Sequence, residues 1–375
     1  MSLQEEIDEK RKVIHTDSYP VSIGELISMY ESEPSELDIH PEFQRFVRWD
    51  DNQKSKFIES ILLGIPIPPI FVSQREDGVW DVIDGLQRLA TIFGFVGSLK
   101  DEEGNFETPL KLIETPYLKS LEGKVWHDPA NPSNSFTLSQ RLYLKRGKFD
   151  VQIIKKESSP DIKYELFQRI NTLGSKLSAQ ELRNCIFIMI DRELYNWIES
   201  LSNYPSFKNC LNLSEKDYLE KYDQEIVSRF FVIKNANLEE IRKAGDLEDY
   251  ITNYLIKIWK LPDFNRVEAE SIFKRTFDLL NDTLEDDSFK KWNLSKEKFE
   301  GRFLVSSFEA IAIGLANNIN NWEINETNKN EIKAKLKQRV IDLWTDPHFS
   351  GNIGRGVKFN TRIPTVVPLG QVTFR

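Results

Sequence analysis

The stretch Val82-Ile83-Asp84-Gly85-Leu86-Gln87-Arg88-Leu89 decides the local fold of this chain, because a β-rich run passes through Asp-Gly directly into a helical pattern. The first backbone N–H groups of a helix have no partner inside it, and with the helix dipole they favour an anion. Gly85 is expected to let the backbone approach a phosphate closely. The turn therefore predicts an anion-binding site. Leu89, Ile92, Phe93 and Val96 recur at helical spacing and predict the buried face of the helix.

Asp84 and Arg88 leave two interpretations of this turn open. Arg88 falls in the first helical turn, where a cation opposes the helix dipole unless an anion is nearby. Asp84 is placed to cap the helix, or to hold a metal ion or a ribose hydroxyl. The alternative is a structural turn with an N-cap aspartate and a surface arginine, because short motifs of this kind often occur without function.

The residues around the turn predict a mixed α/β region. Asp50 and Gln53 form a capping-box pattern that opens a helix, and Gly64 ends it. Three prolines between positions 66 and 69 then force an extended path. Turn residues at 76–78 separate two β-rich runs and predict a hairpin. The predicted strands are 70–73, 79–83 and 149–154, with a loop-rich insertion over 100–148.

From about residue 160 the pattern changes to helices. A capping box at Ser178 and Glu181 opens one of them. The last 25 residues carry four basic residues and no acidic one, a charge of +4. Helical periodicity recurs over 161–170, 223–235, 247–260, 266–284, 297–320 and 327–345. We predict an α+β protein with a mixed α/β domain over 1–157, an all-α helical domain over 158–345 and a basic C-terminal tail over 346–375.

The composition is that of a globular protein and excludes several functional classes. Of 375 residues, 40% are hydrophobic, and 50 basic against 59 acidic residues give a net charge of −9. This balance argues against a general nucleic-acid coat, while a local basic patch stays open. Two cysteines exclude a disulfide scaffold, and four histidines without HxxxH or HExxH spacing argue against a histidine-based metal hydrolase. Because no secretory or membrane-spanning pattern is visible, we expect a cytoplasmic protein without membrane contact.

Two further clusters are candidate contributors to the site. Arginine and aromatic residues alternate over residues 43–49. This pattern is typical of segments that bind phosphate groups or stack on bases. The alternative is an edge strand with exposed arginines. Asn171 and Gly174 follow a predicted helix, where a helix–loop–helix corner explains them equally well. Residues 351–358 have P-loop glycine spacing but lack its lysine, and Asp346–His348 has no second histidine for an HNH nuclease. We therefore reject both motifs.

Taken in chain order, these clusters resemble the N-terminal domain of GmrSD-type modification-dependent restriction systems, which has a ParB/sulfiredoxin-like nucleotide-binding fold. The resemblance covers roughly residues 20–235. Its FQR-x-x-x-W element is matched by Phe43, Gln44, Arg45 and Trp49, and its IESIL-x-G-x-P-x-P segment by residues 58–68. Its IDGQQR motif is matched by Ile83, Asp84, Gly85, Gln87 and Arg88, and a last element by Phe167, Asn171, Gly174, Leu177, Glu181 and Leu182.

The resemblance implies a component of anti-phage defence that binds or hydrolyses an NTP, either GTP or ATP, with Mg²⁺. It implies that Asp84, Gln87 and Arg88 are the candidate catalytic residues, and that the nucleotide is bound by Arg45, Asp84, Gly85, Gln87, Arg88 and Asn171. Leu86 stands where the family has glutamine, so binding without turnover stays open.

The family's HNH nuclease residues do not follow the helical region, which implies that a separate HNH-type subunit cleaves DNA. The alternative is a DNA-binding or protein-bridging module on the same fold without NTPase activity. The sequence does not identify the metal ligands or the oligomeric state.

Overall fold

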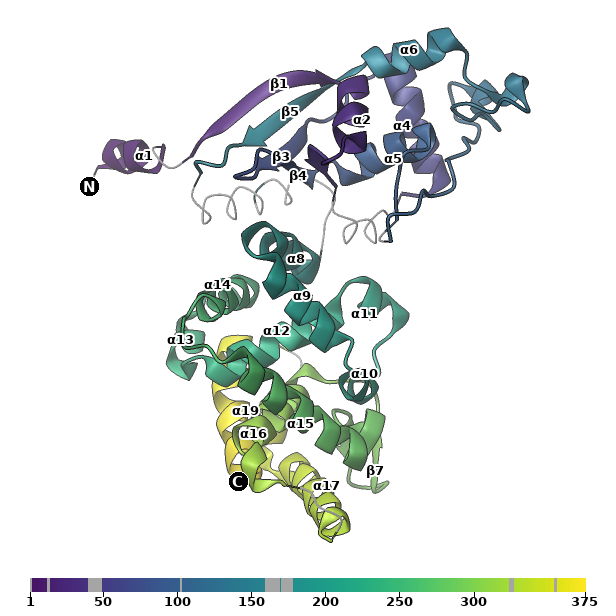
Figure 1. The fold of residues 1–375 in the computed structure, drawn as a ribbon. Coiled ribbons are helices and arrows are strands. Elements are labelled where there is room, and N and C mark those ends of the chain that lie inside the picture. The colour runs from purple at the N-terminus through teal and green to yellow at the C-terminus, as the bar shows by residue number, and fades with distance from the viewer. Residues whose placement is uncertain are drawn as a thin grey trace. The chain divides into compact units, whose positions relative to one another are not determined.

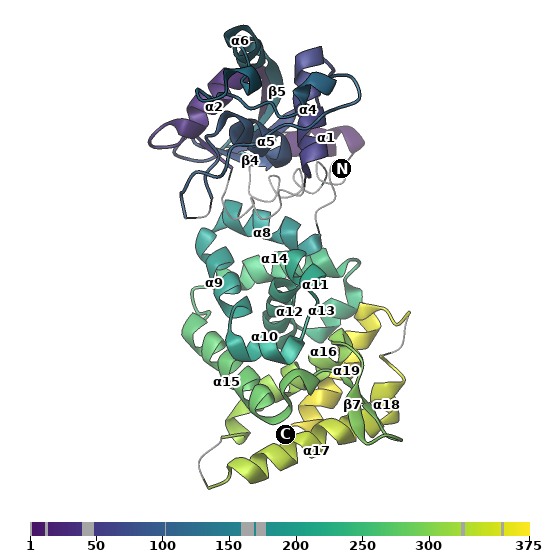
Figure 2. The same ribbon diagram turned by 90° about the vertical axis from the view of Figure 1, so that its right-hand side faces the viewer.

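The structure is a computed structural model that describes residues 2–11, 14–39, 49–101, 103–158, 169, 178–323, 327–353 and 356–375. The chain divides into two compact units, residues 1–176 and 177–375, and each is described by itself. The first unit combines a mixed sheet with helices, and the second is mainly helical (Figures 1 and 2). The predicted α+β class is confirmed.

The first unit is built on a five-stranded sheet in the order β1-β5-β3-β4-β2 (Figure 1). β1 runs antiparallel to β5, and β5 runs parallel to β3. β3 and β4 form the predicted antiparallel hairpin, and the short β2 runs parallel to β4. The strands are β1 (Thr16–Ser22), β2 (Leu37–Asp38), β3 (Ile70–Gln74), β4 (Trp80–Asp84) and β5 (Lys148–Ile154).

The helices of the first unit begin and end largely where local signals place them. Asp50 and Gln53 form the predicted capping box of α4, and Gly64 ends that helix with a φ of 69°. The apolar faces of α4 and α5 join the strands in one core, in which Ile58, Leu89 and Val151 are fully buried. The helices are α1 (Leu3–Arg11), α2 (Ile23–Glu31), α4 (Asp51–Leu63), α5 (Leu86–Val96) and α6 (Leu138–Arg146).

In the ranges that the structure describes, the second unit consists of helices and one short hairpin of β6 (Lys291–Asn293) and β7 (Lys298–Glu300). The helix expected over 297–320 starts later, at Val305, because β7 and a left-handed Gly301 precede it. The helix expected over 161–170 lies, except for Arg169, outside the described residues. The longer helices are α8 (Ala179–Ile190), α9 (Arg192–Ser202), α12 (Tyr222–Asn235), α14 (Leu247–Trp259), α15 (Arg266–Leu284), α16 (Val305–Asn317) and α17 (Lys329–Thr345). Shorter ones are α10 (Pro205–Leu211), α11 (Glu215–Leu219) and α13 (Leu238–Lys243).

The basic tail predicted over 346–375 is instead part of the second unit. It holds α18 (Pro347–Ser350) and α19 (Phe359–Thr373), and α19 packs against α16. Apolar residues at positions 363, 366 and 367 of α19 are buried at helical spacing. Arg362 does not face solvent as a free cation, because it donates to both carboxylate oxygens of the buried Glu309 at 2.7 and 2.8 Å. The sequence interpretation missed this apolar stripe because the segment also contains prolines and positive charges, which are typical of a tail.

Candidate functional site

The turn between β4 and α5 has the strand–turn–helix geometry that the sequence predicts. Asp84 ends β4, and Gly85 is the N-cap of α5 with a φ of 103°. A Cβ at Gly85 would lie 3.0 Å from Cγ1 of Ile70 and 3.3 Å from Nη2 of Arg88. The space that a side chain at position 85 would need is therefore occupied by Ile70 and Arg88. Both this close packing and the left-handed backbone require glycine at this position.

Arg88 lies in an internal ion pair. Its Nη2 donates to Oδ2 of Asp84 at 2.5 Å, and its Nη1 donates to the carbonyl oxygens of Pro68 at 2.6 Å and Pro69 at 3.1 Å. The residue is only 8% exposed. The anion beside Arg88 is therefore the carboxylate of Asp84, which belongs to the same chain. The alternative of an N-cap aspartate with a surface arginine is wrong on both counts, because Asp84 bonds to Arg88 and makes no side-chain cap for α5.

The N-terminus of α5 differs from those of its neighbours. Side chains of Ser22, Asp50 and Thr137 cap α2, α4 and α6, whereas α5 has no side-chain cap. Across the ranges that the structure describes, the backbone amides of Leu86 and Arg88 have no hydrogen-bond acceptor. This terminus therefore presents donors and the positive end of the helix dipole. The side chain of Leu86 is half-buried and packs against the core.

Gln87 connects the turn to the segment before α4. Its Oε1 accepts a hydrogen bond from the backbone N–H of Trp49 at 3.2 Å, and the Trp49 ring contacts the edge of Phe57 with centroids 5.4 Å apart. Arg45 and Asn171, which complete the expected set of binding residues, lie outside the described residues. Of that set, the structure therefore brings together Asp84, Gly85, Gln87 and Arg88.

Glu59 is a buried carboxylate that the sequence patterns did not single out. It lies on α4, is 4% exposed, and one carboxylate oxygen accepts hydrogen bonds from Oγ1 of Thr115 (2.5 Å) and the amides of Tyr117 (3.0 Å) and Leu118 (2.8 Å). It thereby anchors the insertion over 100–148 to the core. An ionisable residue inside the apolar stripe of α4 was the available signal, because buried carboxylates require donors.

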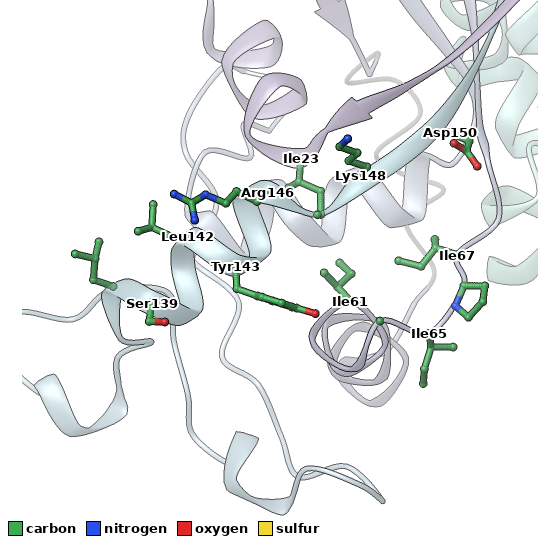
Figure 3. A pocket seen from close by; sticks show the side chains of 14 residues that line it. Ile23, Ile61, Ile65, Ile67, Ser139, Leu142, Tyr143, Arg146, Lys148 and Asp150 are labelled. Atoms are coloured by element: carbon green, nitrogen blue, oxygen red, sulfur yellow. The ribbon is translucent and has the colours of Figure 1, made fainter.

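A groove of about 1080 Å³ lies beside the start of the proline segment (Figure 3). Its walls come from the end of α4, residues 64–67, α6 and the start of β5. The same extended segment continues into Pro68 and Pro69, whose carbonyls bind Arg88. The sequence did not predict this groove, because its walls lie about 80 residues apart in the chain.

Other polar groups of the described residues do not form a reactive centre. No group of three potential metal-binding side chains occurs within the described ranges. Cys185 and Cys210 are both buried, and burial raises the pKa of both thiols, that of Cys210 to about 12. In the second unit, Arg183 and Arg229 both pair with Glu248, at 2.5 and 3.0 Å, and tie α8, α12 and α14 together.

Residues 23–188 match the family model described as GmrSD restriction endonuclease, N-terminal domain. This part of the chain belongs to that family. The match runs from the start of α2 into α8, so it includes Glu59, the Asp84–Arg88 turn and the groove. Comparisons with curated proteins and with solved structures found no match. The match of residues 23–188 to this domain suggests a component of a GmrSD-type restriction system. Among the described residues, no helix combines the length and the apolar character needed to span a membrane.

Proposed function

We propose that the GmrSD N-terminal domain of this chain binds a nucleoside triphosphate at the N-terminus of α5, and that this binding regulates a nuclease supplied by another chain. The observation that carries the proposal is the uncapped start of α5, where the amides of Leu86 and Arg88 have no acceptor among the described residues. Phosphate oxygens are the ligands that such a terminus favours, because the N–H donors and the helix dipole both attract negative charge.

The ion pair gives Asp84 and Arg88 a positioning role in this proposal. Arg88 holds the end of β4 and the proline segment together, so that the amides keep a fixed direction. Gln87 positions the segment that begins at Trp49. We propose that Arg45 supplies the second positive charge, that Asn171 closes the site, and that Mg²⁺ accompanies the phosphates as in other NTP sites. With Leu86 packed against the core in place of the family glutamine, we expect binding of GTP or ATP with little hydrolysis.

The test uses two glycines at opposite ends of α5. Gly85 (φ 103°) precedes the helix and Gly97 (φ 88°) ends it, so both alanine variants place a side chain on a left-handed backbone of the same helix. Gly85→Ala also brings its Cβ within 3.0 Å of Cγ1 of Ile70, whereas the nearest atom to a Cβ at Gly97 is Cγ of Pro109 at 3.4 Å, so thermal unfolding of both variants accompanies the titration. Calorimetric titration with GTP and with ATP in Mg²⁺ should show binding to the wild type, binding at least about tenfold weaker to Gly85→Ala, and near wild-type binding to Gly97→Ala. Wild-type protein that binds neither nucleotide would refute the proposal. Equal loss in both variants would refute the placement of the phosphates at this terminus.

A protein-bridging or DNA-binding module without nucleotide is the second candidate function. The internal Asp84–Arg88 pair favours it, because the turn carries no net charge from these two side chains. Arg362 no longer supports the DNA arm of this alternative, since it is paired with Glu309. A gel-shift series with duplex DNA at rising salt tests it, because phosphate contacts produce a steep loss of affinity. No shift at low salt would exclude the DNA arm.

A further inference from the structure

Helix α1 is short, amphipathic and exposed. Leu3 and Ile7 are one turn apart on one face; Leu3 is 74% exposed and Ile7 is half-buried. Four acidic residues lie between positions 5 and 9. Figure 1 shows α1 beyond the start of β1, away from the sheet of its own unit. Because an isolated helix of this length is marginally stable in water, α1 gains stability from a surface that covers its apolar face.

The groove in Figure 3 has the apolar character of a docking surface. Ile65, Leu138 and Leu142 line it and are 43%, 64% and 39% exposed. The ring of Tyr143 points from α6 toward Ile61 at the end of α4 (Figure 3). Large apolar side chains gathered around one concave surface are typical of interaction sites. A nine-residue helix is about 14 Å long and about 10 Å across, which is roughly 1100 Å³ and matches the volume of the groove.

The charges around the groove are opposite to those of α1. Two cations, Arg146 and Lys148, line the groove. Neither of the two forms an ion pair within the part of the chain that the structure describes. Asp150 is the one acidic residue that lines the groove, against Arg146 and Lys148. Unpaired cations beside an apolar groove select an acidic amphipathic segment over a neutral or basic one.

In the structure α1 lies beyond the start of β1, whereas the groove lies at the other end of that strand (Figure 1). Thr16 pairs with Ile154, whereas Ser22 pairs with Lys148 at the groove, so the length of β1, about 20 Å, separates the two places. We propose that α1 docks in this groove on a second copy of the chain, so that the α1 helices join subunits in a dimer or a longer assembly.

Light scattering after size-exclusion chromatography of the full chain tests this proposal at loading concentrations from about 5 to about 100 µM. The wild type should have a mass above the 43.8 kDa of one chain, rising with concentration. Ile7→Asp in α1 and the double variant Arg146→Glu/Lys148→Glu in the groove should both be monomeric. Lys56→Glu/Lys119→Glu is the matched control, because it makes the same charge change at exposed lysines that do not line the groove.

A labelled peptide of residues 1–14 gives the second readout. It should bind the full-length Ile7→Asp chain, and Arg146→Glu/Lys148→Glu added to that chain should weaken binding at least about tenfold. A peptide with Glu5→Lys and Glu6→Lys should bind the charge-reversed groove more tightly than the wild-type peptide does.

The proposal is overturned if the wild-type chain stays monomeric at about 100 µM. This holds even if the peptide still binds, because α1 then does not join two copies of the chain. An assembly that survives either Ile7→Asp or Arg146→Glu/Lys148→Glu also overturns it, because another surface would then hold the copies together. Nucleotide titration of the monomeric variants is independent of both outcomes, so the failure of this proposal is distinguishable from failure of the nucleotide site.

Discussion

Replacement of Arg88 by alanine should loosen the start of α5 and the proline segment together. Arg88 makes hydrogen bonds to Asp84, Pro68 and Pro69 while 8% exposed, so alanine removes all three and leaves a carboxylate and two carbonyls without this donor. Removing one partner of a buried ion pair costs about 3–5 kcal/mol. The Asp84 side chain is 24% exposed and regains water, which places the expected loss at about 3 kcal/mol.

Asp84→Asn gives the matched comparison at the same turn. The asparagine oxygen still accepts from Arg88, and the two proline carbonyls keep their donor, so the expected loss is only about 1 kcal/mol. The double variant should lose less than the sum of the two single variants, because the residues contact each other.

Hydrogen exchange followed by mass spectrometry reports each unit separately. A loss of about 3 kcal/mol corresponds to roughly 100-fold faster exchange of the amides in α5. Peptides from α15 in the second unit serve as the internal control and should change little. Less than about threefold acceleration in α5 on Arg88→Ala would refute the view that this arginine holds the turn, and would make it again a candidate for direct phosphate binding.

Three further predictions concern the second unit. A Cβ at Gly370 would overlap the carbonyl of Ala310, so Gly370→Ala should destabilise this unit by about 3 kcal/mol in urea unfolding, whereas Gly245→Ala, with open space around it, should change stability by less than about 1 kcal/mol. Burial raises the pKa of Asp223, and its Oδ1 has no hydrogen-bond partner among the described residues. The unfolded chain therefore loses this proton at lower pH than the folded chain, and stability falls as pH rises between the two pKa values. Asp223→Asn should raise the melting temperature at pH 7, and the gain should shrink toward pH 3; a gain that grows on acidification would contradict this sign. Cys185 and Cys210 should react with a thiol reagent only after unfolding, because burial raises the pKa of both and excludes the reagent; rapid labelling of the native chain would show that the unit opens.

The elements that the sequence predicted depend on neighbours a few residues apart. The capping box of Asp50 and Gln53 and the left-handed Gly64 fix the bounds of α4 within the chain itself. The hairpin of β3 and β4 and the start of α5 at Leu86 follow from equally local turn chemistry. The helical stripe of α19 was present in the sequence as well, but four basic residues and two prolines in the segment favoured a tail.

The sequence by itself determined that Asp84, Gly85, Gln87 and Arg88 lie where a strand ends and a helix begins. The turn and helix-start signals that place them there act over four residues or fewer. Only the tertiary structure decided what these groups do: Arg88 turns to Asp84 and the proline carbonyls, Glu59 binds the 115–118 turn, and α6 meets the end of α4 to form the groove. Those partners lie up to about 80 residues apart, and they meet only because the core pairs the strands and helices that carry them. A guanidinium takes whichever acceptors the fold brings to it, so its partners follow from that pairing and not from its position in the sequence.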